Sequence, residues 1–271
     1  MEKQFLFPGK SINYSMNGSG PVVVLLHGFL ENMGIWENLI PFLEKDFTVV
    51  CIDLPGFGKS EIVAENHTMP LMAEVVNHVL QEENIEQGVM LGHSMGGYVA
   101  LAFAEKYPNK LKGLVLFHSQ AAADDSEAKK NRDRTIEIVK SDHKNFIGTF
   151  IPLLFAEENV AKFGIEITQL KTVSEQTSIA GICAALAGMR DRDDHLQLLK
   201  LIDIPVFFIV GKQDSRIAME KILPQLALPK NCEALILDGV GHMGFIESKE
   251  ITAQAIKHFA ERMNIGFFES K

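Results

Sequence analysis

Six short apolar runs divide the chain, and three of them are rich in the β-branched residues typical of buried strands. They lie at residues 21–26 (PVVVLL), 48–52, 89–91, 114–117, 205–210 (PVFFIV) and 234–237. A run without polar alternation is apolar on both faces, as in a sheet that is covered on both sides. Residues 68–82 carry apolar side chains at helical spacing between two of these runs. The alternation predicts an α/β fold with a mostly parallel central sheet flanked by helices.

Other segments add to this pattern. Residues 5–7 and 11–15 flank Pro8-Gly9 and predict a hairpin, so the sheet is expected to be antiparallel at its start. Residues 121–195 contain no run of the buried-strand type, so we expect them to form a helical cap (lid) and 1–120 with 196–271 to form the core. The predicted helices outside 68–82 lie at 36–43, 124–140, 144–155, 160–173, 178–189 and 249–263.

Composition and charge limit the partners of the protein. The 271 residues include 35 acidic and 26 basic side chains, a net charge of -9. An acidic chain is a poor match for nucleic acid or an anionic membrane. Cys51, Cys183 and Cys232 have no metal or redox spacing, which favours a reduced setting. No run approaches the ~20 apolar residues of a membrane span, and the N-terminal segment lacks a secretory signal. We expect a soluble cytoplasmic protein, and the sequence predicts no oligomeric state.

Residues 89–107 contain the strongest candidate for chemistry. The apolar run 89–91 is followed by Gly92-His93-Ser94-Met95-Gly96 and then by an alanine- and aromatic-rich helical stretch. In a strand–G-x-S-x-G–helix arrangement, the serine lies on a sharp turn at the end of the strand. The following helix directs its N-terminal N–H groups toward that point. The two glycines allow the strand and the helix to cross closely. Ser94 is therefore the candidate nucleophile.

Two further side chains follow buried strands and complete a possible triad. Asp214 follows the run 205–210, and His242 follows the run 234–237. In a parallel sheet, loops that follow strands meet at one edge. A serine hydroxyl needs a base to take its proton, which His242 can do, and a carboxylate such as Asp214 holds the imidazole in the required tautomer.

Other carboxylates compete with Asp214 for the role of the acid. Asp203 precedes its strand and so lies at the opposite edge of the sheet, and Asp238 is too close to His242 in sequence to turn back toward it. Asp124 and Asp125, after the run 114–117, stay open as alternatives.

An oxyanion hole requires two backbone N–H donors near Ser94. The residue after the nucleophile, Met95, supplies one donor at a helix N-terminus. Phe29 is the candidate for the other, because the chain reverses after the run 21–26.

Five motifs together resemble the α/β-hydrolase superfamily. They are HGF (27–29), DLPGFGKS (53–60), GHSMGG (92–97), GKQD (211–214) and GHMGFIE (241–247). The most similar group comprises lidded serine esterases, C–C hydrolases, perhydrolases and cofactor-free haloperoxidases, and the resemblance does not extend to the cap. It implies Ser94 as nucleophile, Asp214 as acid, His242 as base, and Phe29 and Met95 as oxyanion donors.

Differences from related groups narrow the range of reactions that this resemblance implies. Serine rather than aspartate at position 94 argues against epoxide hydrolase and dehalogenase chemistry. The elbow lacks the tryptophan of the proline iminopeptidase branch, and HGF in place of three consecutive glycines disfavours esters of tertiary alcohols.

The remaining motif residues are assigned supporting roles. His27 is expected to brace the oxyanion loop, His93 to support the elbow, and Asp53 to bind backbone N–H groups of its own loop. His118 ends a strand that faces the predicted pocket and is a candidate for substrate contact. Gly58-Lys59-Ser60 is not a phosphate-binding loop, because Asp53 stands where that motif needs glycine.

The sequence thus predicts a serine hydrolase that cleaves a small to medium carboxylic ester through an acyl-enzyme on Ser94. We expect no metal and no organic cofactor, and a small-molecule substrate with an apolar acyl part. A C–C bond hydrolase or a perhydrolase with the same triad is an alternative, as is a ligand receptor of the same fold with slow turnover. The complete triad favours an enzyme, while the natural substrate and the pathway are not encoded in any motif.

Overall fold

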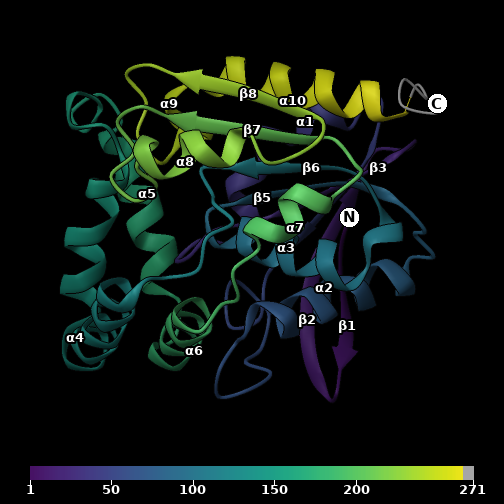
Figure 1. Ribbon diagram of the computed structural model, residues 1–271. Helices are drawn as coiled ribbons and strands as arrows, with labels where there is room; N and C mark the ends of the chain where they lie inside the picture. The colour runs from purple at the N-terminus through teal and green to yellow at the C-terminus, as the bar shows by residue number, and fades with distance from the viewer. Residues whose placement is uncertain (265–271) are drawn as a thin grey trace.

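An eight-stranded sheet forms the centre of the structure, a computed structural model that describes residues 1–264 (Figure 1). The strand order is β1-β2-β4-β3-β5-β6-β7-β8. β1 and β2 run antiparallel to their neighbours, and the remaining strands are parallel to one another. The strands are β1 (Glu2–Phe7), β2 (Lys10–Asn17), β3 (Val22–Leu26), β4 (Thr48–Ile52), β5 (Gly88–His93), β6 (Leu111–Phe117), β7 (Val206–Gly211) and β8 (Cys232–Leu237). The predicted fold class and the antiparallel start of the sheet are confirmed.

Helices cover both faces of this sheet. α1 (Ile40–Leu43) and α10 (Lys249–Asn264) pack together on one face, and α2 (Met69–Glu82) and α3 (Met95–Lys106) pack together on the other (Figure 1). The strands from β3 to β7 are largely buried on both sides, which explains their continuous apolar runs. The expectation that the run 234–237 is also buried on both sides is wrong, because β8 lies at the edge of the sheet and Ile236 is 40% exposed. No helix within residues 1–264 is both long and apolar enough to cross a membrane.

The carboxyl ends of the central strands lie in register at one edge of the sheet. His93 at the end of β5 pairs with Phe117 at the end of β6, and Phe117 pairs with Ile209 near the end of β7. Gly211 at the end of β7 pairs with Leu237 at the end of β8. The loops that follow β5, β6, β7 and β8 therefore start from the same edge, which brings their side chains together.

Helices α4, α5 and α6 lie together beyond this edge, at the left and lower left of Figure 1. They belong to residues 121–195, which contain no strand and which we call the cap segment. Its helices are α4 (Ser126–Phe150), α5 (Gly164–Glu175) and α6 (Ile179–Arg190), joined by the short 3-10 turns Ile151–Leu154 and Glu157–Asn159. The division into core and cap stays a prediction, and residues 265–271 of the predicted core lie outside the described residues.

Some predicted elements differ from those observed. The helix expected at 36–43 is a 3-10 turn, Met33–Trp36, followed by the four-residue α1. The helices expected at 124–140 and 144–155 join into α4, which is kinked at Asp142 (φ -156°, ψ 77°). Asp142 Oδ1 accepts the N–H of Asn145 at 3.1 Å, so this side chain caps the second half of α4. The structure also contains α7 (Leu196–Leu201), α8 (Met219–Leu226) and α9 (Gly244–Glu247), which the apolar pattern does not predict.

The close approach of α3 to the end of β3 yields a stability prediction. A Cβ atom added at Gly96 would lie 2.4 Å from the carbonyl oxygen of Leu26, and this backbone atom cannot rotate away. We expect Gly96→Ala to lower the free energy of unfolding by roughly 1–3 kcal/mol, measured by urea denaturation. Gly148→Ala in α4 is the matched control, because a Cβ there meets no atom within 4 Å. The control should be neutral or stabilising, by up to about 1 kcal/mol. Equal stability of the two variants would contradict the steric explanation.

Candidate active site

Ser94 lies on the turn between β5 and α3 with a backbone conformation that side-chain-bearing residues rarely adopt (φ 51°, ψ -115°). Hydrogen bonds from neighbouring strands hold this conformation. The Ser94 N–H donates to the carbonyl oxygen of Phe117 at 2.9 Å, and the Ser119 hydroxyl donates to the carbonyl oxygen of Ser94 at 2.8 Å. The Ser94 side chain makes no capping hydrogen bond to α3. The strained turn therefore leaves the Ser94 hydroxyl without a hydrogen bond to the helix.

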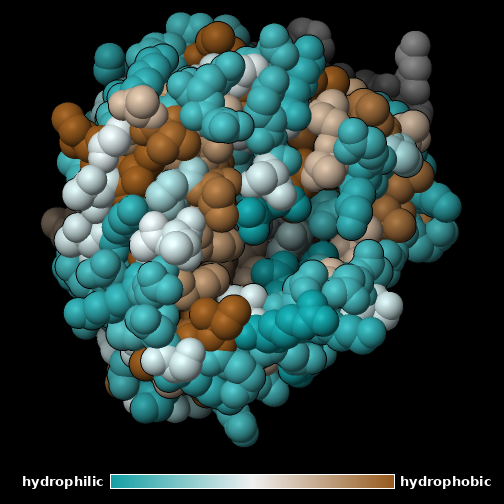
Figure 2. Space-filling model, turned by 90° about the vertical axis from the view of Figure 1, so that its left-hand side faces the viewer, coloured by the Kyte–Doolittle hydropathy of each residue, from teal (hydrophilic) through white to brown (hydrophobic). Residues whose placement is uncertain are grey.

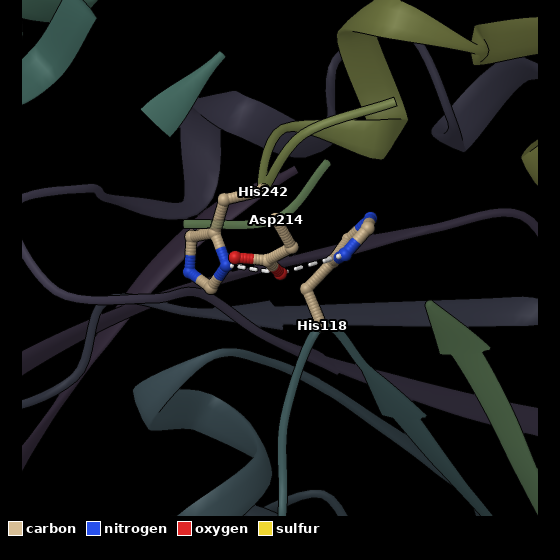
Figure 3. Close-up of side chains that lie close together, drawn as sticks. All are labelled: His118, Asp214 and His242. Carbon is tan, nitrogen blue, oxygen red and sulfur yellow. Dashed lines mark hydrogen bonds and ion pairs between the residues drawn. The ribbon is translucent and has the colours of Figure 1, made fainter. Parts of the chain in front are cut away.

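Asp214 lies between two imidazole rings, as Figure 3 shows. Its Oδ2 atom is 2.8 Å from Nδ1 of His242 and 3.1 Å from Nδ1 of His118. Its Oδ1 atom accepts the N–H groups of Arg216 and Ile217 at 2.8 and 3.0 Å. Four donors thus fix the carboxylate in position. His242 is held in the tautomer whose Nε2 atom is free to accept a proton.

The environment keeps Asp214 ionised and His118 neutral. Burial acts to raise the pKa of Asp214, but the electrostatic interaction with His242 and the hydrogen bonds from both imidazoles hold it well below its usual value. Burial lowers the pKa of His118 to about 4, although its bond to Asp214 opposes this. A neutral His118 donates its Nδ1 proton to Asp214.

The same three side chains are of the types that bind metal ions, and their ligand atoms lie within 4.8 Å of one another. Neighbouring ligands of a tetrahedral zinc ion with bonds of about 2.0–2.1 Å stand roughly 3.3 Å apart. Both nitrogens instead approach a single oxygen, at 2.8 and 3.1 Å, which is hydrogen-bond geometry.

The two candidate oxyanion donors come from two different segments of the chain. Met95 is the first residue of α3, and Phe29 is in the loop that follows β3. Within residues 1–264, neither backbone N–H donates a hydrogen bond to another residue. His27 braces this loop: its Nε2 atom accepts the N–H of Leu54 at 2.9 Å, and its Nδ1 atom donates to the carbonyl oxygen of Gly28 at 2.8 Å.

A buried ion pair, which the sequence analysis did not identify, connects three loops of the site. Glu31 Oε2 is 3.0 Å from Nδ1 of His93 and accepts the N–H of Gly28 at 2.5 Å. Nε2 of His93 donates to the carbonyl oxygen of His242 at 2.9 Å. Both nitrogens of His93 thus face acceptors, which the protonated ring satisfies. Glu31 and His93 link the oxyanion loop, the elbow and the loop that carries His242.

The pKa values of this pair follow from the same contacts. Burial acts to raise the pKa of Glu31, but the neighbouring His93 outweighs it, and the pKa lies below its usual value. Burial acts to lower the pKa of His93, and Glu31 outweighs it in turn, so that this pKa is raised. Both shifts favour the ionised form of the pair.

The cap segment is hydrogen-bonded to the loop that carries His242. The His242 N–H donates to the carbonyl oxygen of Leu154 at 2.6 Å. Glu247, at the end of the GHMGFIE motif, accepts the N–H groups of Ala156 and Gly241 at 2.9 and 3.0 Å. One carboxylate thus binds both the cap segment and the loop that carries the candidate base.

Ser94, His242 and Phe29 line one cavity of about 390 Å³ between the edge of the sheet and the cap segment. Figure 2 views this side of the molecule and shows a hollow near its centre. Of the aromatic and methionine residues of the cap segment, Phe146, Phe150 and Met189 line the cavity, whereas Phe155 and Phe163 pair with each other elsewhere.

The structure places the candidate residues in distinct roles. Of the carboxylates weighed from the sequence, Asp214 contacts His242, whereas Asp124 pairs with Arg132 and Arg192. His118 is completely buried beside Asp214 and is not among the cavity-lining residues, so its position does not fit the expected contact with substrate. The roles of Glu31 and Glu247 were not predicted from the sequence. The available signal was an acidic residue within a motif, Glu31 in HGFLE and Glu247 in GHMGFIE.

The fold and the geometry of this edge agree with the comparisons. Residues 21–161, just over half of the chain, match the family model of the alpha/beta hydrolase fold. The chain belongs to the α/β-hydrolase family and is an enzyme of that class.

Named relatives span nearly the whole chain. A pimeloyl-acyl-carrier-protein methyl ester esterase of Pseudoalteromonas atlantica is 30% identical over 244 residues, which cover 86% of this chain and 92% of the relative. The enzyme of the same name from Aeromonas hydrophila is 28% identical over 266 residues, 92% of this chain and 99% of the relative. A malate-bound structure of a thermophilic esterase from Thermogutta terrifontis superposes with a TM-score of 0.90 at 29% identity and covers 97% of this chain and 99% of that one.

The Glu31–His93 pair yields a prediction about stability. Glu31→Gln leaves a buried imidazole without its counter-charge, so we expect the free energy of unfolding to fall by about 3 kcal/mol. The exposed Glu37 provides the matched control, Glu37→Gln, which should change little. Urea denaturation of both variants and the native protein measures the difference.

The same comparison predicts a pH dependence. The raised pKa of His93 contributes to the free energy of unfolding. This contribution is fully present below pH 6.5, the ordinary pKa of histidine, and is lost as the pH rises through the folded-state pKa. The lowered pKa of Glu31 gives stability that is complete above the ordinary value of 4.5 and is lost at more acidic pH. The stability difference between the native protein and Glu31→Gln should therefore be largest between pH 4.5 and 6.5. A difference that does not change with pH would argue against an ion pair.

Proposed function

We propose that the protein hydrolyses carboxylic esters through a covalent acyl-enzyme on Ser94. One observation carries the proposal: Ser94, on its strained turn, and His242, which is bonded to Asp214, line the same cavity. The relatives that span most of the chain are named as esterases, which supports an ester as the substrate.

The reaction has two halves in this proposal. Nε2 of His242 takes the proton of Ser94 as its Oγ atom attacks the ester carbonyl carbon, and Asp214 stabilises the imidazolium. The N–H groups of Phe29 and Met95 bind the oxyanion, where each donor is worth about 3 kcal/mol. The tetrahedral intermediate then expels the alcohol, which receives the proton from His242. A water molecule, activated by the same base, releases the acid and restores Ser94.

The cavity supports a small to medium substrate with an apolar part. Its volume of about 390 Å³ is at the lower end of the range for ligand pockets. Phe146, Phe150 and Met189 of the cap segment, together with Leu154 and Leu186, provide apolar surface for an acyl chain or a ring.

Fluorophosphonate labelling tests the proposal directly. We expect a single covalent adduct, mapped to Ser94 by peptide mass spectrometry, and hydrolysis of p-nitrophenyl butyrate. Ser94→Ala should prevent the adduct and reduce hydrolysis by at least about 10⁴-fold, because the nucleophile is lost. Asp214→Asn should reduce kcat by about 10⁴-fold, because the amide no longer holds the imidazole in the required tautomer.

Matched controls separate catalysis from folding. His242→Ala should prevent labelling, whereas His258→Ala should not, because His258 is exposed on α10. Asp238→Asn should leave activity intact, because Asp238 pairs with Lys212 on the surface. Full activity of Ser94→Ala would refute the nucleophile. If Asp124→Asn were more damaging than Asp214→Asn, the assignment of the acid would be wrong. Tight ligand binding without labelling or turnover would favour a receptor.

A further inference from the structure

Basic side chains also line the cavity that contains Ser94 and His242. Arg132 of α4, Arg216 after β7 and Lys221 of α8 are among its lining residues. Asp124 and Glu31 are the acidic side chains of the lining. Hydrolysis of a neutral ester at Ser94 does not require cations in the lining of the cavity. Whether these cations can bind a substrate depends on which of them are already paired with carboxylates.

The acidic side chains of the lining are already paired. Glu31 holds His93. Asp124, almost fully buried, is shared by two guanidinium groups: it lies 3.0 Å from Nε of Arg132 and 2.6 Å from Nη1 of the buried Arg192. One carboxylate therefore balances two arginines, and a net positive charge stays in this part of the wall. Lys221 lies 3.8 Å from Asp125, and Asp125 does not line the cavity.

Arg216 has no carboxylate within ion-pair distance among residues 1–264. Its Nε atom donates to the Ser215 hydroxyl at 3.1 Å, and its guanidinium lies 5.3 Å from the centroid of the Phe150 ring. Both neighbours line the same cavity. These contacts orient the planar guanidinium, and its terminal nitrogens stay available to a ligand. Residue 216 as a whole is solvent-exposed.

The surroundings of Arg216 are unfavourable for a cation without an anion. Partial burial of the guanidinium lowers the pKa of Arg216, Asp214 acts in the opposite direction, and the positive charge of Arg132 lowers this pKa further. Arg132 and Arg216, which line the same cavity, thus repel each other. An anion bound near both would weaken this repulsion, and a guanidinium binds carboxylate or phosphate oxygens through two parallel hydrogen bonds.

We propose that Arg216, assisted by Arg132, binds an anionic group of the substrate, so that the enzyme prefers esters that carry a carboxylate or phosphate away from the scissile bond. This inference rests on the proposed ester hydrolysis at Ser94 and names its substrate class. The protein as a whole carries a net charge of -9, which repels anions at long range. Selectivity for an anion must therefore come from the local arginines.

Matched esters test this selectivity. Methyl hexanoate and monomethyl adipate have the same acyl length and differ by a terminal carboxylate, and the methyl ester of 6-phosphooxyhexanoate replaces that carboxylate with phosphate. Shorter and longer homologues of each series allow for the reach from Ser94 to Arg216. We expect kcat/KM to be at least 10-fold higher for one charged series than for the neutral series at the best length, since a hydrogen bond to a charged group typically gives about 10- to 100-fold. The preferred series identifies the anion.

Variants assign the preference to Arg216. In Arg216→Gln the ratio of charged to neutral kcat/KM should fall by about 10-fold or more, whereas Arg216→Lys should keep part of it, because the charge remains but the planar fork is lost. Arg134→Gln is the control: Arg134 is exposed on α4, pairs with Glu127 and does not line the cavity. The control should leave the ratio unchanged. The preference should also weaken in high salt.

The outcomes separate this inference from the proposed function. Labelling of Ser94 and hydrolysis of methyl hexanoate, without a preference for either charged series at any length, would overturn the anion site and leave the esterase intact. An unchanged ratio in Arg216→Gln would also overturn it. Absence of labelling and of hydrolysis of every ester would refute the esterase, and with it the substrate class named here.

Discussion

The candidate site depends on one buried ion pair. Glu31 and His93 lie 62 positions apart in the sequence, and together they hold the N–H of Gly28 and the carbonyl oxygen of His242. Neither ion could stay charged inside the protein alone, because removing a charge from water is costly without a partner. Since the pair binds three loops at once, the oxyanion loop, the elbow and the loop of His242 are fixed relative to one another. Pre-organisation of this kind lets donors stabilise a developing charge without first having to reorient.

The elbow adds a steric constraint to this electrostatic one. A Cβ atom on Gly92 of β5 would meet the backbone of α3, and a Cβ atom on Gly96 of α3 would meet the backbone at the end of β3. The tight crossing gives Ser94 its positive φ and exposes its hydroxyl to the cavity. His118 also has a positive φ and occupies the equivalent position after the next strand, where it donates to Asp214. Two strained residues at adjacent strand ends thus present the candidate nucleophile and support the candidate acid.

The cap segment contributes hydrogen bonds and side chains to the site. Its backbone at Leu154 and Ala156 is bonded to His242 and Glu247, so a displacement of the cap would strain the loop that carries the candidate base. The same segment supplies apolar side chains to the cavity, together with Asp124 and Arg132. The position of the candidate base and the lining of the cavity therefore both depend on this one segment.

The amino-acid sequence by itself determined the order of buried strands, the parallel sheet and the placement of Ser94, Asp214 and His242 at the ends of strands. These features follow from local patterns, since apolar periodicity defines a strand and loops after parallel strands meet at one edge. Only the tertiary structure decided that His118 lies behind Asp214 rather than in the cavity, that Glu31 pairs with His93, and that Arg132 and Arg216 share a wall with the nucleophile. Each of these contacts joins residues far apart in the chain, and no periodicity records them. They arise from the path of the cap segment and from loop conformations that packing, rather than local propensity, selects.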